Sequence, residues 1–173
     1  MWLKLLGSIF VIITGTYIGF KLASRCSTRP QHIRQIISCI VSLKSYINYV
    51  SMPLPDALVK STAGTEGPVS VFFRDTAALL EFNGWMNPQQ AIKEVLGKME
   101  DKLAIEKPER EILSLLGANL GSMNREEQNK YLNMIQEQLE NIEQEAVKTR
   151  DQNSKMYKYL GVCGGLAVVI LFI

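Results

Sequence analysis

The sequence contains few of the residues on which catalytic and metal sites usually depend. Its single histidine is His32, and its three cysteines, Cys26, Cys39 and Cys163, form no C-x-x-C pair. These counts give no support to a disulfide framework or a zinc site, and they exclude most histidine-based chemistry. We therefore expect no catalytic residues, no cofactor and no metal ligands. An enzyme that uses unrecognised carboxylates is the least favoured hypothesis.

Phosphate-binding glycine motifs are also missing. No G-x-x-x-x-G-K-[ST] sequence occurs, and the glycine-rich loop at residues 64–67 contains Glu66 and no lysine. A P-loop needs the backbone N–H groups of that motif and its lysine to hold nucleotide phosphates. We expect no nucleotide bound in a P-loop, and no small-molecule substrate.

Acidic residues are absent from the first third of the chain. Residues 1–55 carry six basic side chains and no acid, whereas residues 56–173 hold the other 13 bases and all 17 acids. This basic stretch could be a nucleic-acid patch, but it adjoins an apolar segment and lacks interleaved aromatic residues. Membrane topology is the favoured cause, and no nucleic-acid partner is expected.

Each end of the chain carries an uncharged apolar segment. Leu5 to Phe20 and Tyr159 to Ile173 contain no charged side chain. As helices they cover roughly 24 Å and 22 Å, against a hydrocarbon core of about 30 Å, so flanking residues must reach the interface. We predict an N-terminal transmembrane anchor over residues 1–24 and a C-terminal one over residues 159–173. A secretory signal peptide and a buried core helix are the respective alternatives.

Basic residues beside the two segments predict their orientation. They are concentrated on the side of each anchor that faces the middle of the chain, which the positive-inside bias places in the cytoplasm. These topology-setting residues are Lys21, Arg25, Arg29, Arg34, Lys155 and Lys158.

Each anchor also contains two glycines four residues apart. The pairs are Gly15 with Gly19 and Gly161 with Gly165. Such spacing lets helix backbones approach closely in lipid, so these are candidate residues for membrane-helix packing. The alternative is that glycine is simply frequent in membrane helices.

The middle segment, residues 25–158, reads as helices without an alternating strand pattern. Its prolines open apolar-periodic runs, as is typical of the first turn of a helix. We predict helices near 30–50, 54–61, 68–82, 88–104, 108–121 and 125–158. The chain is therefore predicted to be all-α: a six-helix cytoplasmic bundle flanked by N-terminal and C-terminal transmembrane helices.

Two helices carry apolar residues at steps of three and four, which is the pattern of a heptad seam. We expect the first and last helices to lie antiparallel, as the stem of a hairpin. The seam residues are Ile33, Ile36, Ile40, Leu43 and Ile47 in the first helix, and Leu132, Ile135, Leu139 and Ile142 in the last. The shorter helices are expected to fill the bundle with large side chains that include Phe72, Phe73, Phe82, Trp85, Ile92 and Leu115.

Short fragments along nearly the whole chain resemble one family. They are Arg29-Pro30 with Ile33-Arg34, Tyr49 with Pro53-Leu54 and Ala57, Phe73, Leu116-Gly117, Leu120-Gly121, Gln128 with Lys130, Lys155-Met156-Tyr157, Leu160-Gly161-Val162 and Gly164-Gly165-Leu166. In this order, with an anchor at each end, the sequence resembles stage III sporulation protein AB of endospore-forming Firmicutes. Leu54-Pro55-Asp56 departs from the family pattern, which leaves the start of the second helix open.

The resemblance implies more than the residues do. Members of the family look like the cytoplasmic domain of the type II secretion F-type platform protein. They belong to the channel between mother cell and forespore, in the cell membrane on the mother-cell side, which is the outer forespore membrane. The implied partners are membrane lipid, the ATPase stage III sporulation protein AA and other channel subunits. We therefore expect a non-enzymatic platform subunit that couples this ATPase to the transenvelope assembly. The alternative is a small membrane-bound regulator or receptor whose helical bundle binds a soluble signalling protein.

Overall fold

The computed structural model describes residues 28–120 and 125–172, and for Arg125, 154–155 and 157–172 only the helical backbone is described. Within these residues there are six helices and no strand, as an all-α fold predicts. The helices are α2 (Thr28–Ser45), α3 (Leu54–Ser61), α4 (Pro68–Phe82), α5 (Pro88–Lys98), α6 (Lys107–Asn119) and α7 (Arg125–Phe172). Residues Gln31–Gln144 form one compact unit, which is the helical bundle, and a second unit includes the described residues outside this range.

The predicted anchors fall largely beyond this description. Residues 1–24 lie outside the described residues, and residues 159–172 are the last part of α7, described without their side chains. Within its described residues the chain contains no helix that combines the length and the apolar character of a membrane span.

Prolines place the start of four helices. Each of α3 to α6 has a proline in its first two positions, where a missing N–H removes no helical hydrogen bond. Asn87 caps α5, because its side chain accepts a hydrogen bond from the backbone N–H of Gln90 at 2.8 Å. The departure at Leu54-Pro55-Asp56 does not disturb the second helix of the bundle, which begins at Leu54.

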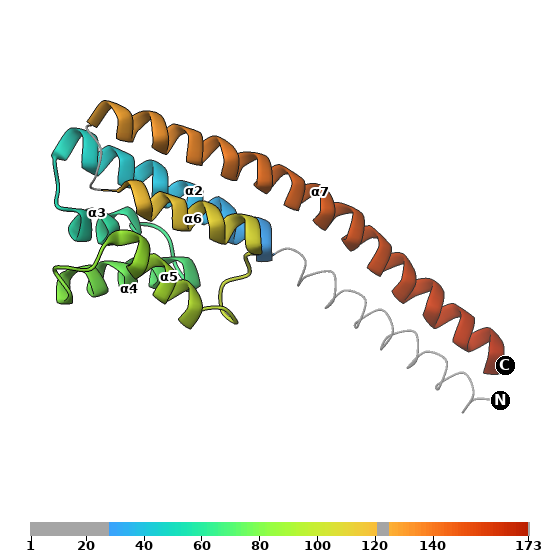
Figure 1. Ribbon diagram of the computed structural model, residues 1–173. Helices are drawn as coiled ribbons and strands as arrows, with labels where there is room; N and C mark the ends of the chain where they lie inside the picture. Colours follow the sequence, from blue (N-terminus) through green and yellow to red (C-terminus); the bar gives the residue numbers. More distant parts are fainter. Residues whose placement is uncertain (1–27, 121–124, 173) are drawn as a thin grey trace. The chain divides into compact units, whose positions relative to one another are not determined.

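Helix α2 and the first part of α7 lie side by side in antiparallel order (Figure 1). Arg34 pairs with Glu143 at 2.5 Å, Lys44 donates to Asn133, and Asn48 donates to Asn129 at 3.2 Å. Each step forward from Arg34 in α2 to Asn48, which lies just beyond the end of α2, is matched by an equal step backward along α7, so the register is constant over these three pairs. We call this pair the stem.

The shorter helices pack on the stem in chain order. Neighbouring helices contact each other from α3 to α6, and α3, α4 and α5 lie on the side of α2 away from α7 (Figure 1). Phe72 and Phe73 are buried between them in an edge-to-face pair with ring centroids 5.2 Å apart. Helix α6 closely approaches α5 at Gly117, where an added Cβ would lie 2.7 Å from the Cα of Gln89.

Two details of the helix boundaries differ from expectation. The first helix continues past Ser45 as a π-helical segment, η1 (Tyr46–Val50), which ends at Ser51 in a left-handed conformation with φ of 53°. Helix α5 ends at Lys98, and the residues predicted to continue it to 104 form a connection. That connection buries Met99, Leu103 and Ile105. Its apolar residues continue the spacing of the helix, although they lie in a loop.

Three residues predicted to fill the bundle are exposed instead. Phe82 at the end of α4 is 88% exposed, Trp85 in the following turn is 82% exposed, and Leu115 on α6 is 48% exposed. The prediction was wrong because an apolar side chain at a helical position can be either buried in the core or exposed at the surface, and the sequence pattern does not separate these cases.

Candidate interaction surfaces

The predicted seam residues meet along the stem. Ile33, Ile36, Ile40 and Leu43 of α2 and Leu132, Ile135 and Leu139 of α7 are at most 1% exposed, while Ile47 and Ile142 are half-buried against the core. Fully burying one such side chain contributes about 1.5–3 kcal/mol. The stem is therefore stabilised mainly by its apolar residues. Its exposed polar pairs help to set the register and add little to stability.

The other predicted site residues are only partly described. Gly15, Gly19, Lys21 and Arg25 lie outside the described residues; Arg29 and Arg34 lie in α2; Lys155, Lys158, Gly161 and Gly165 lie in the part of α7 described without side chains. Arg34 has a structural role in addition to any effect on topology, because its guanidinium forms the ion pair with Glu143.

His32 is a structural residue of the bundle. It is 7% exposed, and its Nδ1 accepts a hydrogen bond from the backbone N–H of Ala104 at 3.0 Å. Burial lowers the pKa of the imidazole below its usual value, which favours the neutral form that can accept this bond. The side chain therefore fixes the α5–α6 connection to α2.

The glycine-rich loop lies beside His32. Gly64 and Gly67 have φ of +80° and +82°, which L side chains rarely adopt, so the turn requires glycine at both positions. Thr65 anchors the loop, because its hydroxyl accepts a hydrogen bond from the buried Cys39 thiol at 3.6 Å. Burial raises the pKa of that thiol. The cysteine is thereby kept as an unreactive part of the core.

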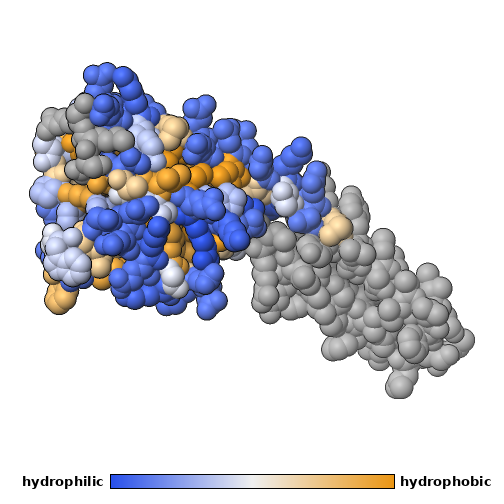
Figure 2. All heavy atoms as spheres, viewed as in Figure 1, coloured by the Kyte–Doolittle hydropathy of each residue, from blue (hydrophilic) through white to orange (hydrophobic). Residues whose placement is uncertain are grey.

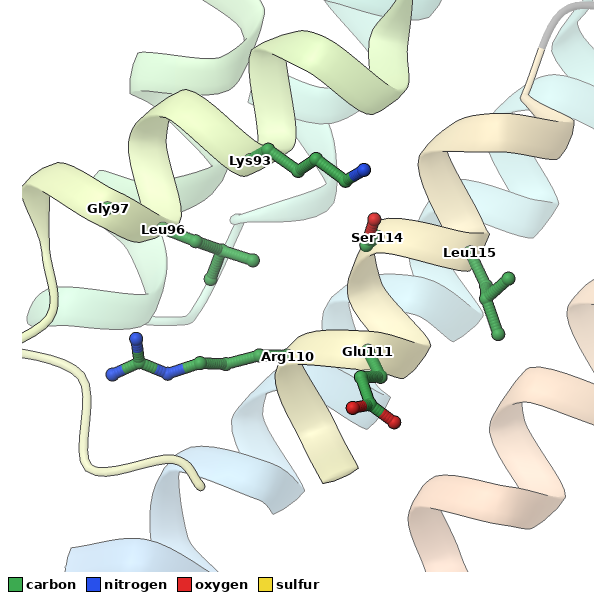
Figure 3. Close-up of a pocket in the computed structure, with 7 residues that line it drawn as sticks. All are labelled: Lys93, Leu96, Gly97, Arg110, Glu111, Ser114 and Leu115. Atoms are coloured by element: carbon green, nitrogen blue, oxygen red, sulfur yellow. The ribbon is translucent and has the colours of Figure 1, made fainter. Parts of the chain in front are cut away.

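A groove of about 590 Å³ opens between α5 and α6. We call it the α5–α6 groove (Figure 3), and its lining residues are Lys93, Leu96, Gly97, Arg110, Glu111, Ser114 and Leu115. Leu96 supplies an apolar wall, and Gly97 leaves space beside it because no atom lies within 4 Å of where its Cβ would be. Arg110 is already paired with Glu100 at 2.9 Å. Within the described residues, Lys93 and Glu111 have no ion-pair partner.

A second exposed feature is the turn between α4 and α5. Phe82 and Trp85 lie three residues apart with almost their whole side chains in water. Residues 82–92 contain no charge, and the adjacent Glu81 is exposed and has no ion-pair partner within the described residues. We call Phe82 to Met86 the aromatic tip. Elsewhere on the bundle, Figure 2 shows a band of apolar side chains along one face.

Carboxylates in the described part of the chain do not assemble a metal site. No group of three or more histidine, cysteine, aspartate or glutamate side chains there could hold an ion. Glu109, whose carboxylate is fully buried, accepts the backbone N–H of Glu106 at 3.0 Å and completes a capping box at the start of α6. Its role is therefore structural, and sequence reasoning missed it, although the Glu-x-x-Glu spacing resembles that of a capping box.

Comparison with known proteins identifies the family. The family model for stage III sporulation protein AB matches residues 4–173. The chain belongs to the stage III sporulation protein AB family. It is 33% identical to stage III sporulation protein AB of Bacillus subtilis (strain 168) over 169 residues, which cover 98% of each chain. A solved structure of stage III sporulation protein AB superposes with a TM-score of 0.67 at 30% identity, covering 72% of this chain and 98% of the other.

The structure explains one of the sequence fragments shared with this family. The Leu116-Gly117 pair places a fully buried leucine beside the glycine that α6 needs to approach α5. The family is a sporulation family and is not a known family of enzymes.

Proposed function

We propose that this chain is a non-enzymatic platform subunit of the channel between mother cell and forespore. In this proposal residues 1–24 and 159–173 anchor it in the outer forespore membrane, with the bundle in the mother-cell cytoplasm. There it transmits force from the partner ATPase, stage III sporulation protein AA, to the transenvelope assembly during endospore formation.

The antiparallel stem is the observation that supports this proposal best. Because Arg34 pairs with Glu143, the two points where the chain enters and leaves residues 31–144 lie at the same end of the bundle. A chain with an anchor beyond each of these points can enter one membrane twice without crossing its own bundle. The basic residues beside both predicted anchors favour the same, cytoplasmic, side.

The continuous helix α7 suits the transmission of force. It runs from the stem through the second predicted anchor without a break, from Arg125 to Phe172. A helix whose hydrogen bonds are unbroken transmits axial displacement better than a flexible linker, and the seam residues of α7 lock its first part to α2. In this proposal α7 is the element that links the bundle to the second predicted anchor.

Affinity purification from sporulating cells tests the proposal. A tagged full chain, solubilised in mild detergent, is expected to co-purify the ATPase and other channel subunits. A matched chain that lacks residues 1–24 should lose the other channel subunits. Recovery of a soluble signalling protein without the ATPase or channel subunits would contradict the platform role and favour a membrane-bound regulator or receptor.

A further inference from the structure

We propose that two copies of this chain bind each other by inserting the aromatic tip of one copy into the α5–α6 groove of the other. This self-association does not require the partner ATPase. Two features of one bundle support it, an exposed apolar tip and an apolar groove, together with the charges beside them.

The aromatic tip has the composition of an interface anchor. Tryptophan is enriched among residues that dominate binding energy, and each aromatic side chain can bury about 150–250 Å². Phe82 and Trp85 are 88% and 82% exposed and find no cover within the bundle. Because residues 82–92 carry no charge, the tip can enter an apolar site without burying an unpaired ion.

The α5–α6 groove has the size and the lining that such a tip needs. Its volume of about 590 Å³ lies within the range of about 300–1,000 Å³ typical of ligand pockets. Figure 3 shows Leu96 directed into the space between the helices, while Lys93 and Arg110 extend along its rim. An aromatic ring seated over Leu96 and Gly97 would therefore have an apolar floor and a polar edge.

Charge supports a second copy as the occupant. Glu81 immediately precedes the tip, and Lys93 lies on the rim of the groove; both are exposed, and within the described residues neither has an ion-pair partner. When the tip of one copy enters the groove of another, these opposite charges approach each other.

The position of the two features on α5 permits reciprocal docking. The tip precedes the helix, and the groove is lined by Lys93, Leu96 and Gly97 near its other end. Two copies with their α5 helices antiparallel would each bring a tip to the groove of the other, as the self-complementary interface of a twofold dimer requires.

The test measures the mass of the full chain in detergent micelles by light scattering, over a range of protein concentrations. We expect Trp85→Ala and Gly97→Leu each to weaken self-association at least about tenfold. Gly97→Leu fills the groove at a position open to solvent, so the fold should survive, and circular dichroism checks that it does. Tyr49→Ala, at another 88% exposed aromatic residue, is the matched control and should associate as the natural chain does.

Mixing variants tests the pairing directly. Trp85→Ala retains a groove and Gly97→Leu retains a tip, so their mixture should associate more strongly than either variant alone. Glu81→Lys and Lys93→Glu should likewise each weaken association and regain it when mixed, because every tip then meets an opposite charge. The proposal is overturned if the natural chain is monomeric at all concentrations, if only one of Trp85→Ala and Gly97→Leu weakens association, or if either mixture shows no gain.

Discussion

Replacement of Gly117 by alanine tests whether α5 and α6 lie too close together at this position to admit a Cβ atom. In the native bundle an added Cβ at this position would lie 2.7 Å from the Cα and 2.9 Å from the backbone nitrogen of Gln89, and 2.9 Å from Cδ1 of Ile92. The first two atoms belong to the backbone of α5 and cannot rotate away. The two helices must therefore separate, which loosens the core around buried residues of α6 such as Leu113 and Leu116.

The magnitude follows from two opposing effects. Alanine is favoured over glycine in a helix by up to about 1 kcal/mol. Overpacking of a close contact typically costs about 1–3 kcal/mol, and a clash with backbone belongs at the upper end of that range. We expect a net loss of about 2 kcal/mol in the free energy of unfolding, equivalent to a fall of about 6 °C in Tm.

Gly97→Ala is the matched control, because this glycine lies in the last turn of α5 with nothing within 4 Å of its Cβ position. It should leave Tm unchanged or raise it by up to about 3 °C. Thermal unfolding of both full-length variants in the same detergent, followed by circular dichroism, gives the comparison. Equal shifts in the two variants, or a stabilised Gly117→Ala, would refute the close approach.

Three further predictions concern single side chains. Burial lowers the pKa of His32, so the unfolded chain binds the proton more readily and the contribution of this residue to the free energy of unfolding should be lost progressively as the pH falls below the usual value of 6.5. Urea unfolding should show a smaller fall in His32→Gln, and an identical fall would contradict the buried Ala104 hydrogen bond. Asn87→Ala should cost about 1 kcal/mol while Asn87→Ser costs much less, because serine can also cap Gln90; equal losses in thermal melts would exclude the cap. Cys39, with its pKa raised by burial, should react with a thiol reagent only after denaturation, and rapid labelling of the native chain would show that the site is open.

The sequence predicts the helices well where proline or asparagine acts locally. Pro55, Pro68, Pro88 and Pro108 each occupy one of the first two positions of a helix because the restriction they impose is a property of their own backbone. The end of α5 was harder to predict. Leu103 continues the apolar pattern while lying in a connection, and no local signal separates the two cases.

The interaction surfaces depend on contacts that sequence periodicity does not contain. Trp85 and Phe82 were predicted to be core because they are apolar, but their place at a turn leaves them outside it. The α5–α6 groove combines residues from two helices that approach each other closely at Gly117, and only the folded chain brings these residues together. The hydrogen bond that neutral His32 accepts likewise comes from Ala104, which lies 72 residues further along the chain.

The proposed function depends most on the side of the membrane that the bundle occupies. Glu66→Cys, at an exposed loop position, provides a probe when Cys26 and Cys163 are replaced by serine and the buried Cys39 is retained. In intact cells we expect a membrane-impermeant maleimide to leave this cysteine unlabelled in the membrane fraction, and permeabilisation to expose it. Labelling in intact cells, or recovery of the chain in the soluble fraction, would contradict a bundle anchored on the cytoplasmic side.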